Sequence, residues 1–362
     1  MVLRKLRSQF IRFTYTKLIK PILFLQDPEA IHDRFILAGR VLNSNPFTRS
    51  LVSVAFKYSD PILQQIVAGI TFKNPVGLAA GFDKDAQIPR LMYNVGFGFA
   101  EVGSITAKPY EGNPRPRLKR LIESKSIWVN YGLKNQGADI IHNHLSNKYF
   151  PLPIGINIAK TNSLETTTPK LAILDYLYTI KLFQDKGDYI AINISCPNAF
   201  GGCQFHDPLL LNQLLFQVDK LKIQKPVFLK LSPDLSKSNL DKIIEVTDKH
   251  HIAGFICTNL NKDHDLPTGG MSGKLVEEKS NRLIKYLYKK TQGKYVIIGL
   301  GGIFSAEDAY KKIRLGASLV QLITGMIFQG PSIIGEINCD LARLLRRDGF
   351  KNISESVGAD NK

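Results

Sequence analysis

A thiol and an amide follow an apolar run in the stretch AINISCPN, residues 191–198. The run is typical of a buried strand, and it ends in Ser195, Cys196, Pro197 and Asn198. A strand needs no such ending for stability, so the ending favours a reactive site at the strand's mouth. A lone cysteine is often only an inert small hydrophobe, but its place directly after Ser195 favours a functional role for Cys196.

Other polar residues interrupt apolar runs elsewhere in the chain. Asn157, Asn193 and Lys230 each lie inside such a run, where an unpaired polar group costs about 1–3 kcal/mol. Buried polar groups generally find partners, so we expect these three side chains to converge on a shared ligand. Further polar residues end the runs, namely Asp83, Lys84, Ser104, Thr106, Lys160, Ser232, Thr258 and Asn259.

Two glycine-rich segments, GLGGIFS at 299–305 and ITGMIFQG at 323–330, indicate the kind of ligand. Backbone N–H groups approach an anion closely where no Cβ intervenes, so both segments favour a phosphate site. Tight turns that simply require glycine are the alternative interpretation. A ring cofactor with a phosphate tail, contacted by Lys230 and several amides, fits FMN. Cys196 is then a candidate for the base that removes a substrate proton while a hydride leaves to the flavin.

Eight short apolar runs alternate with helical patterns from Pro75 onward. The runs lie at 75–82, 99–106, 154–159, 189–195, 227–232, 254–259, 295–302 and 319–325. Each is nearly all apolar, as in a parallel sheet covered on both faces. Helical patterns lie between them at 207–222, 236–250, 276–291 and 305–315, with polar caps at Ser236 and Ser305. This order predicts an α/β fold, a (β/α)8 TIM barrel with its chemistry at the carboxyl ends of the strands.

The first 60 residues predict a helical extension, with an amphipathic helix at 27–42. Residues 1–26 carry six basic side chains and no acid, interleaved with apolar residues at helical spacing. Such a helix can lie in a membrane interface or pack on the protein's own surface, and composition leaves both open. We divide the chain into a membrane-associating extension at 1–60, an FMN-binding barrel at 61–345 and a polar C-terminal tail at 346–362.

Composition limits the possible partners. The 362-residue chain has a net charge of +17, which favours anionic partners. No nucleic-acid-binding motif accompanies this charge, so we expect no nucleic-acid partner. Four cysteines without a C-x-x-C pair indicate a reducing compartment and no metal site. No apolar run is long enough to span a membrane.

The sequence resembles the dihydroorotate dehydrogenase family from about Asp27 to about Ile337. The motifs that carry the resemblance are NPVGLAAGFDKD, FGFAEVGSIT, GNPRPRLKRL, GLKNQGAD, AINISCPN, LKLSPDLS, TGGMSG, IIGLGGI and GASLVQLITGMIFQGP. The resemblance implies an FMN-dependent oxidoreductase that converts dihydroorotate to orotate in de novo pyrimidine biosynthesis. In such enzymes a base removes the C5 proton and a hydride passes from C6 to flavin N5.

The resemblance also implies roles for individual residues. FMN binding falls to Ala80, Gly81, Lys84, Ser104, Asn157, Asn193, Lys230, Thr258, Gly273, Gly302, Ile323 and Thr324. Substrate binding falls to Lys84, Asn193, Asn198 and Asn259, with Asn130 added from the substrate loop. Cys196 matches the position of the catalytic base.

Three features depart from the family pattern. The extension with QDPEAIHDRF resembles the membrane-associated, quinone-dependent class, whose base is normally serine, whereas Cys196 and its loop resemble the soluble class. Val129 occupies the position of the usual substrate-loop asparagine, and Asn130 is displaced by one residue. Leu260 replaces the hydroxyl residue that normally follows Asn259. The last two changes remove expected hydrogen bonds to the pyrimidine.

We therefore expect a peripheral membrane protein, at the cytoplasmic face of the inner membrane, that passes electrons to a membrane quinone. The N-terminal helix would bind the anionic membrane surface, and Phe24, Phe35 and Leu37 would line the quinone's route. The alternative keeps the barrel and FMN but uses a soluble acceptor such as fumarate, or a related dihydropyrimidine as substrate. A non-catalytic flavin-binding or nucleic-acid-binding protein is a third interpretation.

Overall fold

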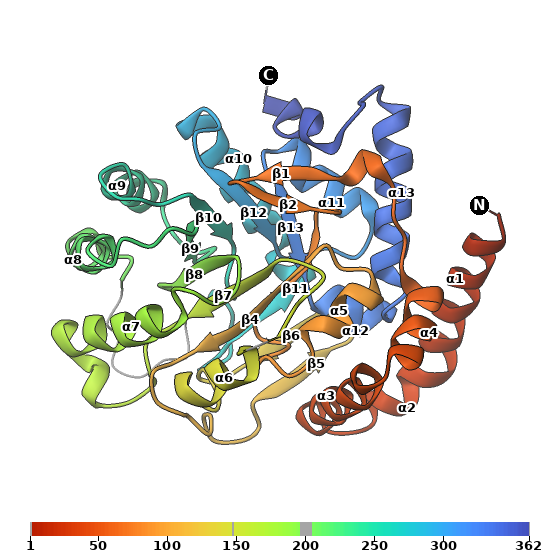
Figure 1. Ribbon diagram of the computed structural model, residues 1–362, viewed down its shortest axis with the longest axis horizontal. Helices are drawn as coiled ribbons and strands as arrows, with labels where there is room; N and C mark the ends of the chain where they lie inside the picture. Colours follow the sequence, from red (N-terminus) through yellow and green to blue (C-terminus); the bar gives the residue numbers. More distant parts are fainter. Residues whose placement is uncertain (1, 147, 196–204, 362) are drawn as a thin grey trace.

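Eight parallel strands form a closed barrel in the computed structural model, which describes residues 2–146, 148–195 and 205–361 (Figure 1). The strands are β3 (Val76–Leu78), β4 (Phe99–Ile105), β7 (Ile154–Ile158), β8 (Tyr189–Asn193), β9 (Val227–Leu231), β10 (Gly254–Cys257), β12 (Val296–Leu300) and β13 (Leu319–Leu322). They follow one another around the barrel in chain order, and β13 pairs with β3 to close it. The predicted fold is confirmed, and every barrel strand lies inside its predicted range.

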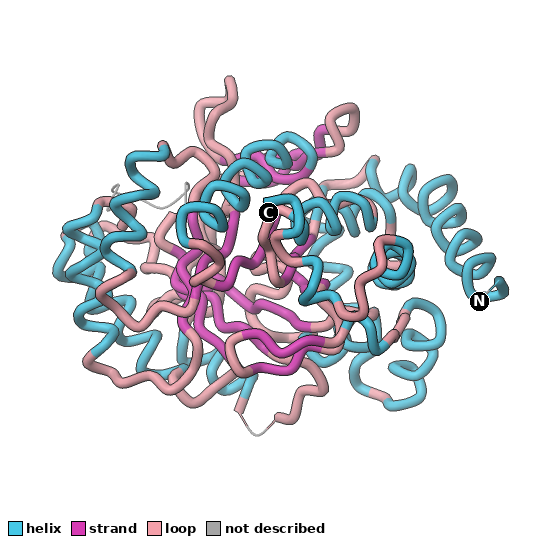
Figure 2. The backbone as a smooth tube through the Cα atoms, turned by 90° about the horizontal axis from the view of Figure 1, so that it is seen from above, coloured by secondary structure: helices cyan, strands magenta, loops and turns pink. Residues whose placement is uncertain are grey.

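Helices surround the strands, as Figure 2 shows in cyan around magenta. They are α5 (Pro89–Val95), α6 (Ala138–Leu145), α7 (Pro169–Phe183), α8 (Pro208–Asp219), α9 (Lys237–Thr247), α10 (Glu277–Thr291), α11 (Ala306–Arg314), α12 (Thr324–Gln329) and α13 (Ile333–Arg347). The four predicted helical patterns correspond to α8, α9, α10 and α11. Both predicted caps form, because Ser236 Oγ accepts a hydrogen bond from the Asn239 N–H at 3.1 Å and Ser305 Oγ accepts one from the Asp308 N–H at 3.2 Å.

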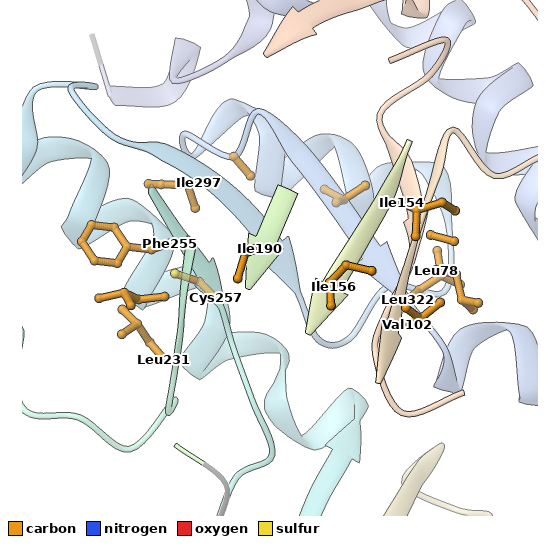
Figure 3. Close-up of a cluster of buried hydrophobic side chains, with 14 of the residues drawn as sticks. Leu78, Val102, Ile154, Ile156, Ile190, Leu231, Phe255, Cys257, Ile297 and Leu322 are labelled. Carbon is orange, nitrogen blue, oxygen red and sulfur yellow. The ribbon is translucent and has the colours of Figure 1, made fainter. Parts of the chain in front are cut away.

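Side chains of the barrel strands alternate between the surrounding helices and the barrel interior. Val102, Ile156, Ile190 and Leu231 belong to the large cluster outside the strands (Figure 3). A second cluster fills the amino-terminal end of the interior and contains Val67, Phe72, Phe99, Tyr189, Ala191, Phe228, Ile256, Ile298 and Leu319. The next inward-pointing residue along each strand, two positions further on, therefore lies nearer the carboxyl end of the barrel.

Two small sheets were not expected from the sequence. A hairpin of β1 (Gln65–Val67) and β2 (Ile70–Phe72) closes the amino-terminal end of the barrel, where the Phe72 and Phe99 ring centroids lie 5.3 Å apart. A three-stranded antiparallel sheet is formed by β5 (Leu118–Leu121), β6 (Ser126–Val129) and β11 (Gly270–Gly273). The loops that contribute β5, β6 and β11 follow barrel strands, so this sheet lies at the carboxyl end.

The N-terminal extension is helical, and its helices lie together on one side of the barrel (Figure 1). They are α1 (Val2–Thr14), a π-helical turn (Tyr15–Ile19), α2 (Lys20–Phe24), α3 (Pro28–Ser44) and α4 (Pro46–Phe56). Arg12 pairs with Glu336 of α13 at 2.9 Å, and the Tyr15 hydroxyl donates to the Ile327 carbonyl at 2.8 Å. None of the helices in the described part of the chain is long and apolar enough to cross a bilayer.

The chain does not end at α13. Residues 353–361 form two short 3-10 helices, Ile353–Ser356 and Ala359–Asn361, and the Ile353 side chain is buried in the main core. Arg314 of α11 pairs with Asp360 and holds the last of these turns against the barrel. The polar segment at 346–362 is therefore packed on the barrel over its described residues.

Candidate active site

A cavity of about 460 Å³ extends from the carboxyl ends of the barrel strands to the helices α2 and α3. Phe24 and Phe35 line its outer part, as expected. Leu37 does not line the cavity and is 59% exposed, so its expected role is wrong. The reason is helical geometry, because a residue two positions after Phe35 points to a different side of α3.

Nearly all of the predicted cofactor residues line the inner part of this cavity. They are Ala80, Gly81, Lys84, Ser104, Asn193, Lys230, Thr258, Gly273, Gly302, Ile323 and Thr324. The substrate candidate Asn259 joins them, whereas Asn157 lies directly behind the wall and is fully buried. Cys196 and Asn198, the predicted base and one substrate residue, lie outside the described residues, as does Cys203.

The three buried polar residues singled out in the sequence meet in one network of hydrogen bonds and an ion pair. Ser104 Oγ donates to Asn157 Oδ1 and accepts from Asn193 Nδ2 at 3.1 Å. Asn157 Nδ2 donates to Glu101 Oε1 at 2.7 Å, and Lys230 Nζ lies 3.8 Å from the same oxygen. The three side chains do come together, but their observed partners are Ser104 and Glu101, an acid not singled out from the sequence. The shared ligand stays a prediction.

The chain leaves β8 at the edge of the cavity. Ser195 Oγ donates to the Lys230 carbonyl at 2.9 Å, and Asn259 Nδ2 donates to the Ser195 carbonyl at 3.2 Å. Asn259 Nδ2 also lies 3.0 Å from Asn193 Oδ1. These contacts fix the residue directly before Cys196 next to two amides that line the cavity.

The structure does not bring Asn130 into this cavity. Val129 lines it instead, and Asn130 lines a second, more open cavity of about 750 Å³. There Asn113 Nδ2 donates to Asn130 Oδ1 at 3.0 Å, and Asn130 Nδ2 donates to Thr268 Oγ1 at 3.4 Å. Neighbouring residues of an extended chain point in opposite directions, so a displacement by one position turns the amide away. Leu260, the other departure from the family pattern, lines the first cavity.

Lys84 is a partly buried cation in the cavity wall. Its Nζ lies 3.8 Å from the centroid of the Tyr131 ring. Burial, followed by the charge of Lys134, lowers the pKa of Lys84 to about 8. Burial, followed by the charge of Lys84, likewise lowers the pKa of His32 to about 4. At neutral pH the cavity therefore presents a charged lysine and an uncharged imidazole.

The inner cavity has glycine backbone and buried polar atoms available to a polar ligand. Gly302 has a φ of +75°, and a Cβ there would lie 2.3 Å from Glu277 Cβ, so only glycine fits. Gly81 has no neighbour closer than 3.9 Å to an added Cβ, which leaves its backbone open to the cavity. Gln321 Oε1 and the Tyr131 hydroxyl are buried without a hydrogen-bond partner among the described residues. Both residues line the cavity and can receive a polar ligand.

Several functional candidates were missed by sequence reasoning. Glu101 and Gln321 are polar residues inside the apolar runs FAEVGSIT and LVQLITG, so the rule that selected Lys230 could have found them. Arg120 had no such signal. It lines the outer cavity, donates to the Gln26 carbonyl at 2.8 Å, and places its guanidinium 4.6 Å from the centroid of the Phe24 ring. Burial lowers the pKa of Arg120.

Comparison with known proteins gives a consistent result. The family model described as dihydroorotate dehydrogenase matches residues 62–345. A protein of a Sulfurovum species named dihydroorotate dehydrogenase (quinone) is 41% identical over 350 residues, covering 95% of this chain and 98% of its own length. Its namesake from Natronomonas pharaonis is 40% identical over 357 residues, covering 95% and 99%.

Solved structures support the same assignment. The structure of the Eimeria tenella enzyme DHODH in complex with ferulenol has a TM-score of 0.82 at 30% identity, and the match covers 93% of this chain and 96% of that chain. The ligand-free Eimeria tenella structure gives the same TM-score and identity, covering 93% and 100%. With the family model matching most of the sequence, the chain belongs to the dihydroorotate dehydrogenase family.

Proposed function

We propose that this protein oxidises dihydroorotate to orotate in pyrimidine biosynthesis, with FMN as its cofactor and a quinone as electron acceptor. One observation carries the proposal: a single cavity joins the polar carboxyl end of the barrel to an apolar passage between α2 and α3. The polar end suits a charged pyrimidine and a flavin phosphate, and the apolar end suits a quinone. The relatives named dihydroorotate dehydrogenase (quinone) support this acceptor.

In the substrate half of the reaction, Lys84 binds the carboxylate of dihydroorotate. Its ammonium is partly desolvated, which strengthens a charge-assisted hydrogen bond. Asn193 and Asn259 are already bonded to each other, so their amides are oriented before the substrate arrives. Cys196 receives the proton from C5, and the neighbouring C6 gives up its hydride. At the sequence position where the family pattern has an asparagine, the Val129 side chain then faces the pyrimidine ring.

In the electron-transfer half, Lys230 and the glycines of the inner cavity would hold FMN. That group would supply the acceptor for the substrate's hydride and the donor of electrons to the quinone. Phe24, Phe35 and Ile31 provide apolar walls for a quinone ring, and Arg120 provides a polar group at the same end. The quinone thus approaches the flavin from the side of the N-terminal helices.

In the proposed function the N-terminal helices bind a membrane surface. Quinones dissolve in the hydrocarbon of a bilayer, so the open end of the passage has to face it. Exposed Phe10, Phe13 and Leu25 on α1 and beside α2 supply apolar contacts, and the basic side chains of residues 1–26 attract anionic lipid headgroups. We therefore propose a peripheral protein on the cytoplasmic face of the inner membrane.

An anaerobic titration tests the function. Purified protein that carries FMN should lose its flavin absorbance when dihydroorotate is added, and should regain it with a short-chain quinone. A protein with no bound flavin, or one that dihydroorotate does not bleach, contradicts the proposal. A second arm replaces the quinone by fumarate, and faster reoxidation by fumarate identifies the soluble-acceptor alternative.

A further inference from the structure

Glu101 is a fully buried acid inside the barrel, and five strands contribute to its surroundings. Asn157 of β7 donates to Oε1 at 2.7 Å. Tyr189 of β8 and Gln321 of β13 donate to Oε2 at 3.1 Å and 2.9 Å. Lys230 of β9 places its Nζ 3.8 Å from Oε1. All four partners are themselves buried.

This arrangement favours an ionised carboxylate. Three neutral donors point at its two oxygens, and a buried cation lies beside it. Charge-assisted hydrogen bonds of this kind stabilise a carboxylate that has left water. Replacing only Glu101 or only Lys230 leaves the other as an uncompensated buried charge, which costs far more stability than removing both. The barrel therefore keeps a negative charge in its interior.

That charge lies directly behind the wall of the cavity. Lys230 and Gln321, two of its partners, line the cavity, and Asn157, a third, binds Ser104 in the same wall. At short range in a low-dielectric interior, one unit charge acts strongly on another. A ligand in the inner cavity thus experiences Lys230 together with Glu101, and the acid offsets part of the lysine's charge.

We propose that Glu101 tunes the flavin by lowering the reduction potential that Lys230 alone would produce. Reduction adds negative charge to a flavin, so a nearby cation favours the reduced form and a nearby anion opposes it. Glu101 is a positioning residue in this scheme, because it acts from behind the wall through charge and through its hold on Lys230. The inference rests on the proposed flavin site.

The test compares the midpoint potential of bound FMN in the wild type and in Glu101→Gln. Glutamine keeps the shape of the side chain and removes its charge. We expect the equilibrium between oxidised and reduced flavin to shift at least tenfold toward the reduced form, which is about 30 mV for a two-electron couple. A potential equal to or below the wild-type value overturns the inference.

Tyr189→Phe is the matched control, because it removes one hydrogen bond to the same carboxylate and leaves the charge in place. Its potential should stay close to that of the wild type, and a shift as large as that of Glu101→Gln would show that packing, not charge, is responsible. If Glu101→Gln does not fold, Glu101→Asp keeps the acid but withdraws it from Lys230. We expect the flavin potential of Glu101→Asp to lie above that of the wild type by less than in Glu101→Gln. A potential equal to that of the wild type contradicts the inference.

The two proposals fail in different ways. Wild-type protein that binds no FMN contradicts the proposed function, and the inference falls with it. Wild-type protein that binds FMN and is bleached by dihydroorotate, together with an unchanged potential in Glu101→Gln, contradicts only the role of Glu101. The dissociation constant of FMN, measured on apo-protein for each variant, provides a readout that does not depend on turnover.

Discussion

Lys230 occupies an inward position of β9 and is only 4% exposed. Its ammonium faces the cavity, so we expect Lys230→Met to weaken FMN binding. Hydrogen bonds to charged groups contribute about 1.5–3 kcal/mol, which corresponds to a loss of affinity of roughly tenfold or more. Fluorescence titration of the apo-protein with FMN measures the change.

Lys312→Met is the control for this prediction. Lys312 is also fully buried, but it lies on the outer side of β12, where it donates to Ser280 Oγ at 2.9 Å and Asn281 Oδ1 at 2.8 Å. Both changes therefore remove a buried ammonium, and only one of the two lysines lines the cavity. Equal FMN affinities in the two variants would contradict the cofactor role of Lys230.

The lowered pKa of Lys84 predicts that substrate binding depends on pH. Its pKa of about 8 means that the ammonium is present below that pH and is lost as the pH rises. In the proposed function this ammonium binds the substrate carboxylate, so the dissociation constant of orotate should be flat below about pH 8 and should rise about tenfold per pH unit above it. Equilibrium titrations with orotate across this range measure the profile.

A substitution at the neighbouring Lys134 provides a second test of the Lys84 titration. Its charge contributes to the low pKa of Lys84, so Lys134→Met should move the break to higher pH. Lys84→Met should bind orotate weakly at every pH and should show no break. A profile that keeps its break in Lys84→Met would assign the titration to another group.

The sequence predicted the residues of the site through composition and position. Lys230, Asn157 and Asn193 were found because polar side chains inside apolar strands require partners, and Glu101 belongs to the same class. Asn130 was misplaced because a one-residue displacement reverses the direction of a side chain, and only the observed course of β6 shows which direction faces the cavity. The role of Cys196 stays a prediction, since it lies outside the described residues.

At the scale of elements, the barrel strands and the amphipathic helices were predictable because their periodicity is carried by many residues. The hairpin of β1 and β2 and the sheet of β5, β6 and β11 were not. Their strands have only three or four residues each, and the sheet pairs β6 with β11, which are separated by more than a hundred positions. Such pairing depends on tertiary contacts that local sequence patterns do not report.

The junction between the N-terminal helices and the barrel depends on Gly330, which ends α12. A Cβ at this position would lie 2.7 Å from Tyr15 Cδ1, and its φ is +89°. Gly330→Ala should therefore push the Tyr15 ring away and loosen α1 and α2. We expect faster limited proteolysis within residues 1–26 and lower quinone-linked turnover, with unchanged flavin reduction by dihydroorotate.

Gly349→Ala is the control that distinguishes the clash with Tyr15 from the conformational cost of placing alanine at a positive φ. Gly349 has a φ of +80°, close to that of Gly330, but an added Cβ there meets nothing within 4 Å. Both variants carry a similar conformational cost of about 1–3 kcal/mol. If Gly349→Ala has the same effect on proteolysis and quinone turnover, general destabilisation explains the result and the Tyr15 contact does not.

At the scale of the whole molecule, the N-terminal helices form a side that differs from the rest of the surface. Exposed apolar side chains gather on these helices, namely Leu6, Phe10, Phe13, Leu18, Ile22, Leu25, Leu37, Val41, Phe47, Leu51 and Val54. The cavity extends to the same helices. One side of the protein thus combines apolar side chains, basic residues and the apolar end of the passage, as a membrane-docking surface requires.

We therefore expect salt-sensitive binding to liposomes that contain anionic lipid, and its loss on deletion of residues 1–26. In the full chain, Phe10→Asp with Phe13→Asp should reduce binding at least tenfold, since each buried phenylalanine contributes about 1.5–3 kcal/mol. Leu209→Asp is the control, because Leu209 is 75% exposed on α8, far from the N-terminal helices in Figure 1. Quinone-linked turnover should fall with binding, while anaerobic flavin reduction survives. A truncated protein that uses quinone as well as the full chain would remove the membrane role and favour the soluble acceptor suggested by Cys196.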